Sequence, residues 1–211
     1  MIVINFKNYV FGAKVLDLVR KVDIYLPKSI VAVSFVDLIE IVKNTTLPVY
    51  TQHIDAYEEG RATGFVIPEA LVSAGAKGSL LNHSEHPAKL ADIKRALDRC
   101  HDAGLKIILC ASTLAQVKKF IPLNPYAIAF EDPQLIATGK SITSHKAHTM
   151  HEFIGLMNGS SIIPLCGAGI STADDVKEAL SIGCKGVLVS SAIAHNNDPE
   201  KFLKDVSRII S

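Results

Sequence analysis

The sequence predicts a closed (β/α)8 barrel that forms a single domain over residues 1–211, with some of its helices shortened. Three observations predict this fold: eight short apolar runs, helical patterns between them, and no linker or low-complexity segment that would divide the chain. An open, doubly wound sheet is the alternative. No GxGxxG motif follows the first apolar run, so a dinucleotide-binding version of that sheet is disfavoured.

Strands are expected where apolar residues follow one another almost without interruption, because strands of a parallel sheet are covered by helices and buried on both faces. Some connections between these runs are short, so several helices are expected to be abbreviated. The expected strands are Ile2–Phe6, Ile30–Phe35, Pro48–Gln52, Gly78–Leu81, Lys106–Cys110, Tyr126–Phe130, Ile162–Cys166 and Gly186–Val189.

Helices are expected between these strands. In one of them Leu90, Ile93, Leu97 and Cys100 recur at helical spacing, which predicts one apolar face, and Gly104 ends the helix.

Two further helices are marked by residues typical of a helix start. Ser171 is expected to cap one of them, with Asp174 and Asp175 in its first turn. Asp198 and Pro199 begin the last helix. The residues expected to face inward from these two helices are Val176, Ala179, Leu180, Phe202, Leu203, Val206, Ile209 and Ile210.

Composition and charge describe an ordinary globular protein. The net charge is +1, with both signs interspersed, which predicts no general attraction to nucleic acid or to an acidic membrane. No apolar run approaches the roughly 20 residues of a membrane span. The four cysteines show no CxxC or disulfide-scaffold spacing, so reduced, buried thiols in a cytoplasmic protein are expected.

Polar and glycine-rich residues gather at the carboxyl ends of the expected strands, where a barrel of this kind builds its active site. Asn5 and Lys7 stand at the end of the first strand, on the same face because side chains alternate. A lysine in the barrel mouth needs an anionic partner, either a substrate phosphate or a carboxylate such as Glu85. A solvated lysine is the structural alternative.

His83 lies in the segment Asn82-His-Ser-Glu85 that follows the fourth strand. Its expected position beside a helix N-terminus would disfavour the imidazolium and keep the ring neutral, able to donate to a carbonyl oxygen. A structural or exposed histidine is the alternative.

Glu131 ends the sixth strand and opens a loop, residues 132–139, that has the character of a mobile lid. A lid excludes water, and burial raises the pKa of a carboxylate, so this is where an enzyme would place a general base. A surface glutamate after a strand is the competing interpretation.

Two turns late in the chain suit a phosphate group. Gly167-Ala-Gly169 follows the seventh strand and Ser190-Ser191 follows the eighth, and these positions commonly hold phosphate in such barrels. Ordinary tight turns are the alternative. His145, His148 and His151 form HxxHxxH, but this spacing turns the first and third side chains apart, so no metal site is expected.

Four of these segments together resemble the triosephosphate isomerase family, in the right order along nearly the whole chain. The length resembles its compact, archaeal-type members. The segments are Asn5-Phe-Lys7, Leu81-Asn-His-Ser-Glu85, Ala129-Phe-Glu131 through Gly139, and Cys166-Gly-Ala-Gly-Ile170.

The resemblance implies interconversion of dihydroxyacetone phosphate and D-glyceraldehyde 3-phosphate in glycolysis and gluconeogenesis, by a homodimer or homotetramer without metal or organic cofactor. Glu131 would move a proton between C1 and C2, while neutral His83 polarises the carbonyl. This family is itself the standard example of such a pair under a closing loop. Lys7 and Asn5 would hold the substrate.

The resemblance also implies roles for residues around this centre. Ser84 and Glu85 would support it. Ile136 would cover the substrate as part of the lid, and the substrate phosphate would meet backbone groups of Gly167, Gly169, Ser190 and Ser191.

The chain departs from the family pattern at the lid and the rim of the site. Many relatives have glycine at the position of Ala137, and proline directly after the base where Asp132 stands here. His86-Pro87 replaces the arginines usual after Ser-Glu, and the serines at 190 and 191 replace two glycines. None of these changes removes a reacting group.

Two other functions compete with this one. Another phosphate-binding barrel, such as a thiamine-phosphate-synthase-like transferase or a sugar-phosphate epimerase, would share the late turns. It would not explain Asn5, Lys7, His83 and Glu131 together. A catalytically silent phosphate-binding or interaction protein would be favoured by loss of the base or the histidine, and both are present.

Overall fold

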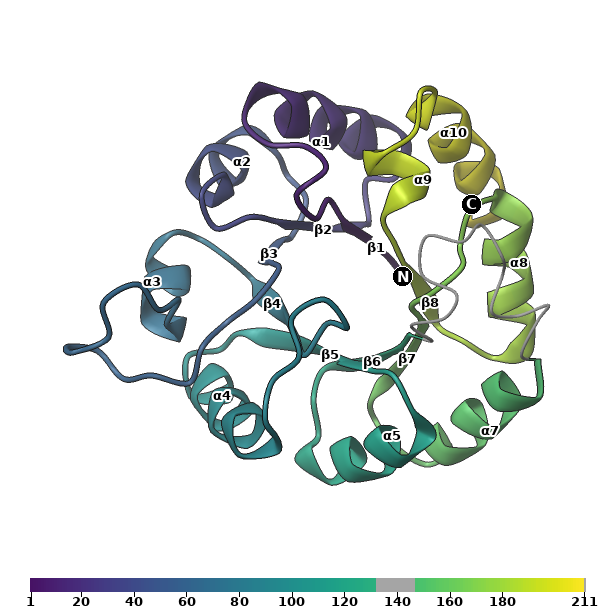
Figure 1. The fold of residues 1–211 in the computed structure, drawn as a ribbon. Coiled ribbons are helices and arrows are strands. Elements are labelled where there is room, and N and C mark those ends of the chain that lie inside the picture. Colours follow the sequence, from purple (N-terminus) through teal and green to yellow (C-terminus); the bar gives the residue numbers. More distant parts are fainter. Residues whose placement is uncertain (132–146, 211) are drawn as a thin grey trace.

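The computed structural model describes residues 1–131 and 147–210. Eight parallel strands pair in chain order, and the last pairs with the first, so the sheet closes into a barrel. Figure 1 views this barrel along its axis, with the helices arranged as a ring around the strands. The predicted (β/α)8 barrel is therefore confirmed, and the open doubly wound alternative is excluded.

All eight predicted strands are present, with ends that differ from the predicted ones by up to two residues. The differences fall where a strand leaves the barrel and its backbone stops pairing with both neighbours. The observed strands are β1 (Ile2–Asn5), β2 (Ile30–Val33), β3 (Val49–Thr51), β4 (Gly78–Leu81), β5 (Lys106–Ala111), β6 (Ala127–Phe130), β7 (Ile163–Cys166) and β8 (Gly186–Val189).

The described helices vary in length, and several are short, as predicted. Helices α2 and α3 have only seven and six residues. The helical elements are α1 (Ala13–Tyr25), α2 (Leu38–Asn44), α3 (Pro68–Ser73), α4 (Leu90–Asp102), α5 (Leu114–Phe120), η1 (Ile121–Leu123, a 3-10 turn), α7 (Ala147–Met157), α8 (Ala173–Ile182), α9 (Ser191–Ala194) and α10 (Pro199–Ile210). None of them is both long and apolar enough to span a membrane.

Helix α8 begins one residue later than predicted. Thr172, not Ser171, is its N-cap: the Thr172 hydroxyl accepts from the Asp175 N–H at 3.2 Å. The Asp175 carboxylate accepts in return from the Thr172 N–H at 2.8 Å, which completes a capping box. Ser171 donates its own N–H to the same carboxylate. Either hydroxyl residue could cap a helix, and the position of Asp175 three residues later selects Thr172.

Two predicted core positions are wrong, each at a helix end. Leu90 and Ile210 are exposed, while Ile93, Leu97 and Cys100 of α4 are buried, as are Phe202, Leu203 and Val206 of α10. A terminal turn projects past the sheet, so its side chains have nothing to pack against. The four cysteines are free and buried, as predicted.

The buried side chains form two layers. A larger cluster fills the space between the strands and the helices. A smaller one lies inside the barrel and includes Val3, Ala32, Tyr50, Cys110 and Ala129. The alternation of side chains along each strand assigns its residues to one layer or the other.

Small side chains lie inside the barrel at paired positions of neighbouring strands. Asn5 is level with Ala32, and Cys110 is level with Ala129. The Tyr50 ring occupies space left by Gly78: a Cβ at residue 78 would lie 2.5 Å from that ring. Gly78 thus makes room for an aromatic side chain inside the barrel.

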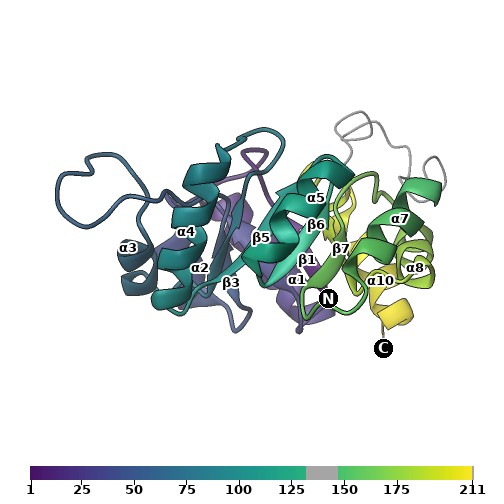
Figure 2. The same cartoon turned by 90° about the horizontal axis from the view of Figure 1, so that it is seen from below.

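The segment between β3 and α3 projects beyond the ring of helices. Both views show it extending away from the barrel on the side of α3 (Figures 1 and 2). Tyr57 and Phe65 stack on each other within it at 3.7 Å between ring centroids, and both are exposed. The segment therefore carries apolar surface away from the core.

We expect Gly78→Ala to unfold the protein or to lower its free energy of unfolding by about 3 kcal/mol or more. A Cβ at this position would lie 2.0 Å from the Lys106 carbonyl oxygen, which belongs to the paired strand and cannot move aside. Gly155→Ala is the matched control. Gly155 lies on an exposed face of α7 with open space around it. Its replacement by alanine should raise the free energy of unfolding by up to about 1 kcal/mol. Urea unfolding of both variants tests this, and equal stability would contradict it.

Candidate active site

A cavity of about 410 Å3 opens at the carboxyl ends of the strands. It brings together residues that lie far apart in the sequence and that the sequence singled out as site candidates. Those lining it are Asn5, Lys7, His83, Glu131, Gly167, Gly169, Ser190 and Ser191.

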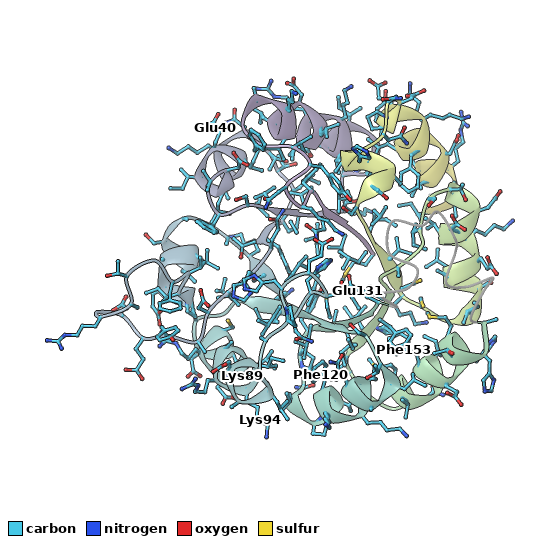
Figure 3. All side chains as sticks on the ribbon, in the orientation of Figure 1. Glu40, Lys89, Lys94, Phe120, Glu131 and Phe153 are labelled. Atoms are coloured by element: carbon cyan, nitrogen blue, oxygen red, sulfur yellow. The ribbon has the colours of Figure 1, made fainter. Side chains whose placement is uncertain are left out.

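Glu131 lies near the barrel axis, as Figure 3 shows. The residue before it, Phe130, points outward and stacks on Phe153 of α7, with 5.2 Å between the ring centroids. Side chains alternate, so Glu131 turns inward, and its N–H donates to the Ala111 carbonyl of β5 at 2.8 Å. The residue is only 1% exposed, which rules out the surface glutamate.

Gly167 leaves the space that the Glu131 side chain occupies. A Cβ on residue 167 would lie 2.6 Å from Glu131 Cγ. The Gly167 N–H donates to the Phe130 carbonyl at 2.9 Å, extending the pairing of β6 with β7. The prediction that this N–H is free for a phosphate is therefore wrong, because the N–H of the residue after β7 still bonds to the last residue of β6.

The hydrogen bonds of His83 fix the tautomer of its ring. Its Nδ1 accepts from the Glu85 backbone N–H at 3.1 Å, so in the neutral ring the proton is on Nε2. That Nε2 lies 3.3 Å from Glu131 Oε1. The imidazole N–H and the carboxylate therefore face each other across the floor of the cavity.

Burial is the main reason that the His83 ring is neutral. It lowers the pKa of His83 to about 4, and the positive charge of Lys7 acts in the same direction, while Glu85 opposes them. The expected helix N-terminus is absent: a turn follows, closed by a hydrogen bond from the His86 N–H to the His83 carbonyl, and α4 begins only at Leu90. The predicted cause was thus wrong.

Burial has the opposite effect on the carboxyl group. It raises the pKa of Glu131 to about 8, which the Ser84 backbone N–H, the Lys7 charge and the Cys110 thiol partly counteract. Glu131 Oε2 is buried and has no hydrogen-bond partner within residues 1–131 and 147–210. The same holds for the hydroxyls of Ser84 and Ser190. Buried polar atoms without partners are rare, and their presence in a cavity suits a polar ligand.

Lys7 is held in place by three hydrogen bonds. Its backbone is left-handed, with φ at 47°, and its N–H donates to Asn5 Oδ1 at 2.9 Å. Gln52 Nε2 donates to the Lys7 carbonyl at 2.8 Å, and Lys7 Nζ lies 2.7 Å from Glu85 Oε1. A substrate phosphate or a carboxylate such as Glu85 was expected as the anionic partner of this lysine, and Glu85 contacts it here.

The two late turns border the same cavity. Gly169 has φ at 69°, a conformation that favours glycine. The backbone N–H groups of Gly169, Ser190 and Ser191 donate to no other residue of the described ranges. Three amide donors in a cavity that the Lys7 side chain also lines suit an anion.

The amino-acid sequence matches the profile of the triosephosphate isomerase family over residues 1–207. The chain belongs to this family. A triosephosphate isomerase of Methanocaldococcus jannaschii is 36% identical over 218 residues, which cover 100% of both chains. Triosephosphate isomerases of Sulfurisphaera tokodaii and Saccharolobus solfataricus are 34% and 35% identical, and each alignment covers 97% of this chain and 93% of the relative.

Some residues that the sequence analysis singled out lie outside the described ranges of this triosephosphate isomerase family member. These include Asp132, Ile136 and Ala137 of the lid, and His145. His148 and His151 are exposed, and they contact Glu152 and the Ala147 carbonyl, respectively. The described residues contain no cluster of three or more side chains suited to a metal ion.

Sequence reasoning missed several residues around the triosephosphate isomerase site. Tyr9 and His195 line the cavity and stack with 5.1 Å between ring centroids. Neither stands in a recognisable motif. Asn82 braces the turn of His83, donating to the Cys110 carbonyl at 2.8 Å and accepting from the Ala88 N–H. Its left-handed backbone, with φ at 60°, is common for asparagine and could have marked this position.

The buried carboxyl group predicts a pH-dependent gain in stability for Glu131→Gln. Because the folded-state pKa of Glu131 is raised above its unfolded value, its ionisation opposes folding progressively from about pH 4.5 up to about pH 8. Relative to wild type, the variant should gain about 1.4 kcal/mol in unfolding free energy per pKa unit of difference, developing across that window. Urea unfolding at several pH values measures this. A stability difference independent of pH would contradict it.

Proposed function

We propose that this chain interconverts dihydroxyacetone phosphate and D-glyceraldehyde 3-phosphate by proton transfer through an enediolate. Family membership supports this reaction. The single structural observation that carries it is the facing pair of Glu131 and His83, with Oε1 and Nε2 at 3.3 Å and the Nε2 proton fixed by the Glu85 N–H. A base and a neutral donor on one face of a substrate are what an enolisation requires.

The proposed steps assign one role to each side chain. The Glu131 carboxylate removes a proton from C1 of dihydroxyacetone phosphate, while His83 Nε2–H donates to the oxygen on C2. Glu131 then returns the proton to C2, and the proton on the C1 oxygen is lost through the same imidazole, which leaves the aldehyde. The enediolate between these steps carries negative charge, so the Lys7 ammonium stabilises it more than the substrate.

The electrostatics of the site match these roles. A base acts best when its pKa lies near the working pH, and burial raises that of Glu131 to about 8. The group that donates to the substrate oxygen should be neutral, because a positively charged ring would pair with the Glu131 carboxylate. The lowered pKa of His83 keeps its ring neutral. The Asn5 side chain fixes the backbone that presents Lys7.

The other end of the cavity is proposed to bind the substrate phosphate. The backbone N–H groups of Gly169, Ser190 and Ser191 are the donors, and the Lys7 ammonium lines the same cavity. Ile136 and the rest of the lid are proposed to cover the substrate. Excluding water there would prevent loss of phosphate from the enediolate.

Neither a metal ion nor an organic cofactor takes part in the proposed steps. A transferase or epimerase of another phosphate-binding barrel family would account for the phosphate end alone. A silent binding protein would have no use for a buried carboxylate facing a fixed imidazole N–H, since burying that charge costs stability. The triosephosphate isomerase reaction accounts for both ends of the cavity.

The purified protein is expected to interconvert the two triose phosphates in a coupled assay, with EDTA present. Glu131→Gln should lower kcat by about a thousandfold or more because the amide cannot accept the proton. It should still bind 2-phosphoglycolate, because the phosphate donors are unchanged. Glu40→Gln is the matched control, on α2 and far from the barrel axis (Figure 3), and should keep full activity. Full turnover by Glu131→Gln would place the base elsewhere.

We also propose that the protein is a homodimer or homotetramer and that it acts in the cytoplasm as a single domain. Phe11, Phe35 and Val36 are exposed near the site end of the barrel, and Tyr57 and Phe65 are exposed on the projecting segment. Apolar surface of this kind is commonly covered by a second subunit. Tyr57→Glu with Phe65→Glu should shift the mass in sedimentation analysis towards the monomer. A wild-type monomer at micromolar concentration would contradict the proposal.

A further inference from the structure

Two histidine rings stack beside the site and take no part in the proposed steps. His53 follows β3, and His86 lies in the turn after β4. Their ring centroids are 3.8 Å apart with an angle of 16° between the planes. His53 Nε2 also contacts Asp55 Oδ1 at 3.3 Å. The stack joins the projecting segment before α3 to the turn that carries His83.

Each ring is one residue away from a group that holds Lys7. Gln52, before His53, donates to the Lys7 carbonyl at 2.8 Å, and Glu85, before His86, accepts from Lys7 Nζ at 2.7 Å. The His86 N–H in turn donates to the His83 carbonyl at 2.8 Å. A displacement of His86 would therefore move the partner of the Lys7 ammonium and the backbone of His83 together.

We propose that His53 and His86 are a positioning pair for Lys7. While both rings are neutral, their stack holds the Glu85 turn against Lys7, and protonation of the pair separates the rings and weakens the Lys7–Glu85 contact. The effect on turnover rests on the proposed function, whereas the effect on the contact itself does not.

The charges around the pair determine the direction of the effect. Burial lowers the pKa of His53, and His86 adds to this, while the hydrogen bond to Asp55 acts against both. Lys89, Asp92 and Arg95 also border the cavity of about 310 Å3 that the two rings line. Asp55 can neutralise one imidazolium, but a second positive charge 3.8 Å away is opposed by Coulomb repulsion. The lowered pKa of His53 keeps the stack intact at neutral pH, and the stack weakens as the pH falls and His53 takes up a proton.

The response depends on the identity of residue 86. An arginine there would stay charged across the physiological pH range, so it could not release the contact in this way. A histidine can be neutral or charged within that range, which is what the proposal requires.

His86→Phe separates titration from stacking, because phenylalanine keeps a flat ring but cannot take a proton. At about pH 8 the variant and the wild type should have similar kcat/KM. At about pH 5.5 the wild type should fall below the variant by roughly threefold to tenfold, the size expected for weakening one partly exposed charge contact, mostly through KM. The titrations of Glu131, of His83 and of the substrate phosphate are common to both proteins and cancel in the ratio.

Two more variants complete the test. His86→Ala removes the stack and should lower kcat/KM at both pH values. His101→Phe removes an exposed histidine at the end of α4 and should follow the wild-type profile. A constant ratio of wild type to His86→Phe across the pH range would overturn the proposal.

A readout without substrate keeps this result separate from the proposed function. NMR signals of the Lys7 ammonium nitrogen and the Glu85 carboxyl carbon should change with the titration of His53 and His86 in wild type but not in His86→Phe. Lys7 and Glu85 signals that behave alike in wild type and in His86→Phe would refute the positioning role. If they follow it while no variant isomerises triose phosphates, the proposed function fails and the positioning pair stands.

Discussion

The burial of one carboxylate is the constraint on which the rest of this site depends. Glu131 is almost completely enclosed, although a buried carboxylate opposes folding at any pH where it is ionised. Its surroundings compensate only in part, through the His83 N–H, the Ser84 backbone and the charge of Lys7. One of its oxygens has no partner among the described residues. The fold thus keeps a carboxylate short of hydrogen bonds, which makes it basic.

The barrel accommodates this carboxylate through small residues at three places. Ala129 and Cys110 are small buried side chains inside the barrel, and Gly167 leaves the space beside Glu131 Cγ. Closure of the sheet sets the register, and the register places Glu131 opposite His83, which follows a strand two positions away in the barrel. The same closed geometry that stabilises the fold therefore also fixes the distance between the two reacting groups.

The sequence predicted the barrel and the residues of its mouth because both follow from one regular pattern. Short, nearly continuous apolar runs mark the strands. The carboxyl ends of parallel strands lie at the same end of the barrel, so Asn5, His83 and Glu131 could be placed together. Features that depend on a single hydrogen bond could not be predicted from the sequence. The cap at Thr172 rather than Ser171, the turn after His83 and the occupied N–H of Gly167 each depend on where the pairing of a strand or a helix stops. The stacks of Tyr9 with His195 and of His53 with His86 join segments that are far apart in the sequence. No local sequence pattern indicates that these segments meet.

In this site the groups proposed to react, Glu131 and His83, are held by different contacts from those that hold Lys7. Glu131 is held from within the barrel, by its position directly after β6 and by burial, whereas His83 stands in the turn after β4, where the Glu85 N–H bonds to its ring and the His86 N–H to its carbonyl. Lys7 is held instead from the rim, by Gln52 and Glu85, whose neighbours are the stacked histidines. Substitutions at the rim can therefore change how firmly Lys7 is held, while the inward direction of the Glu131 side chain stays set by β6.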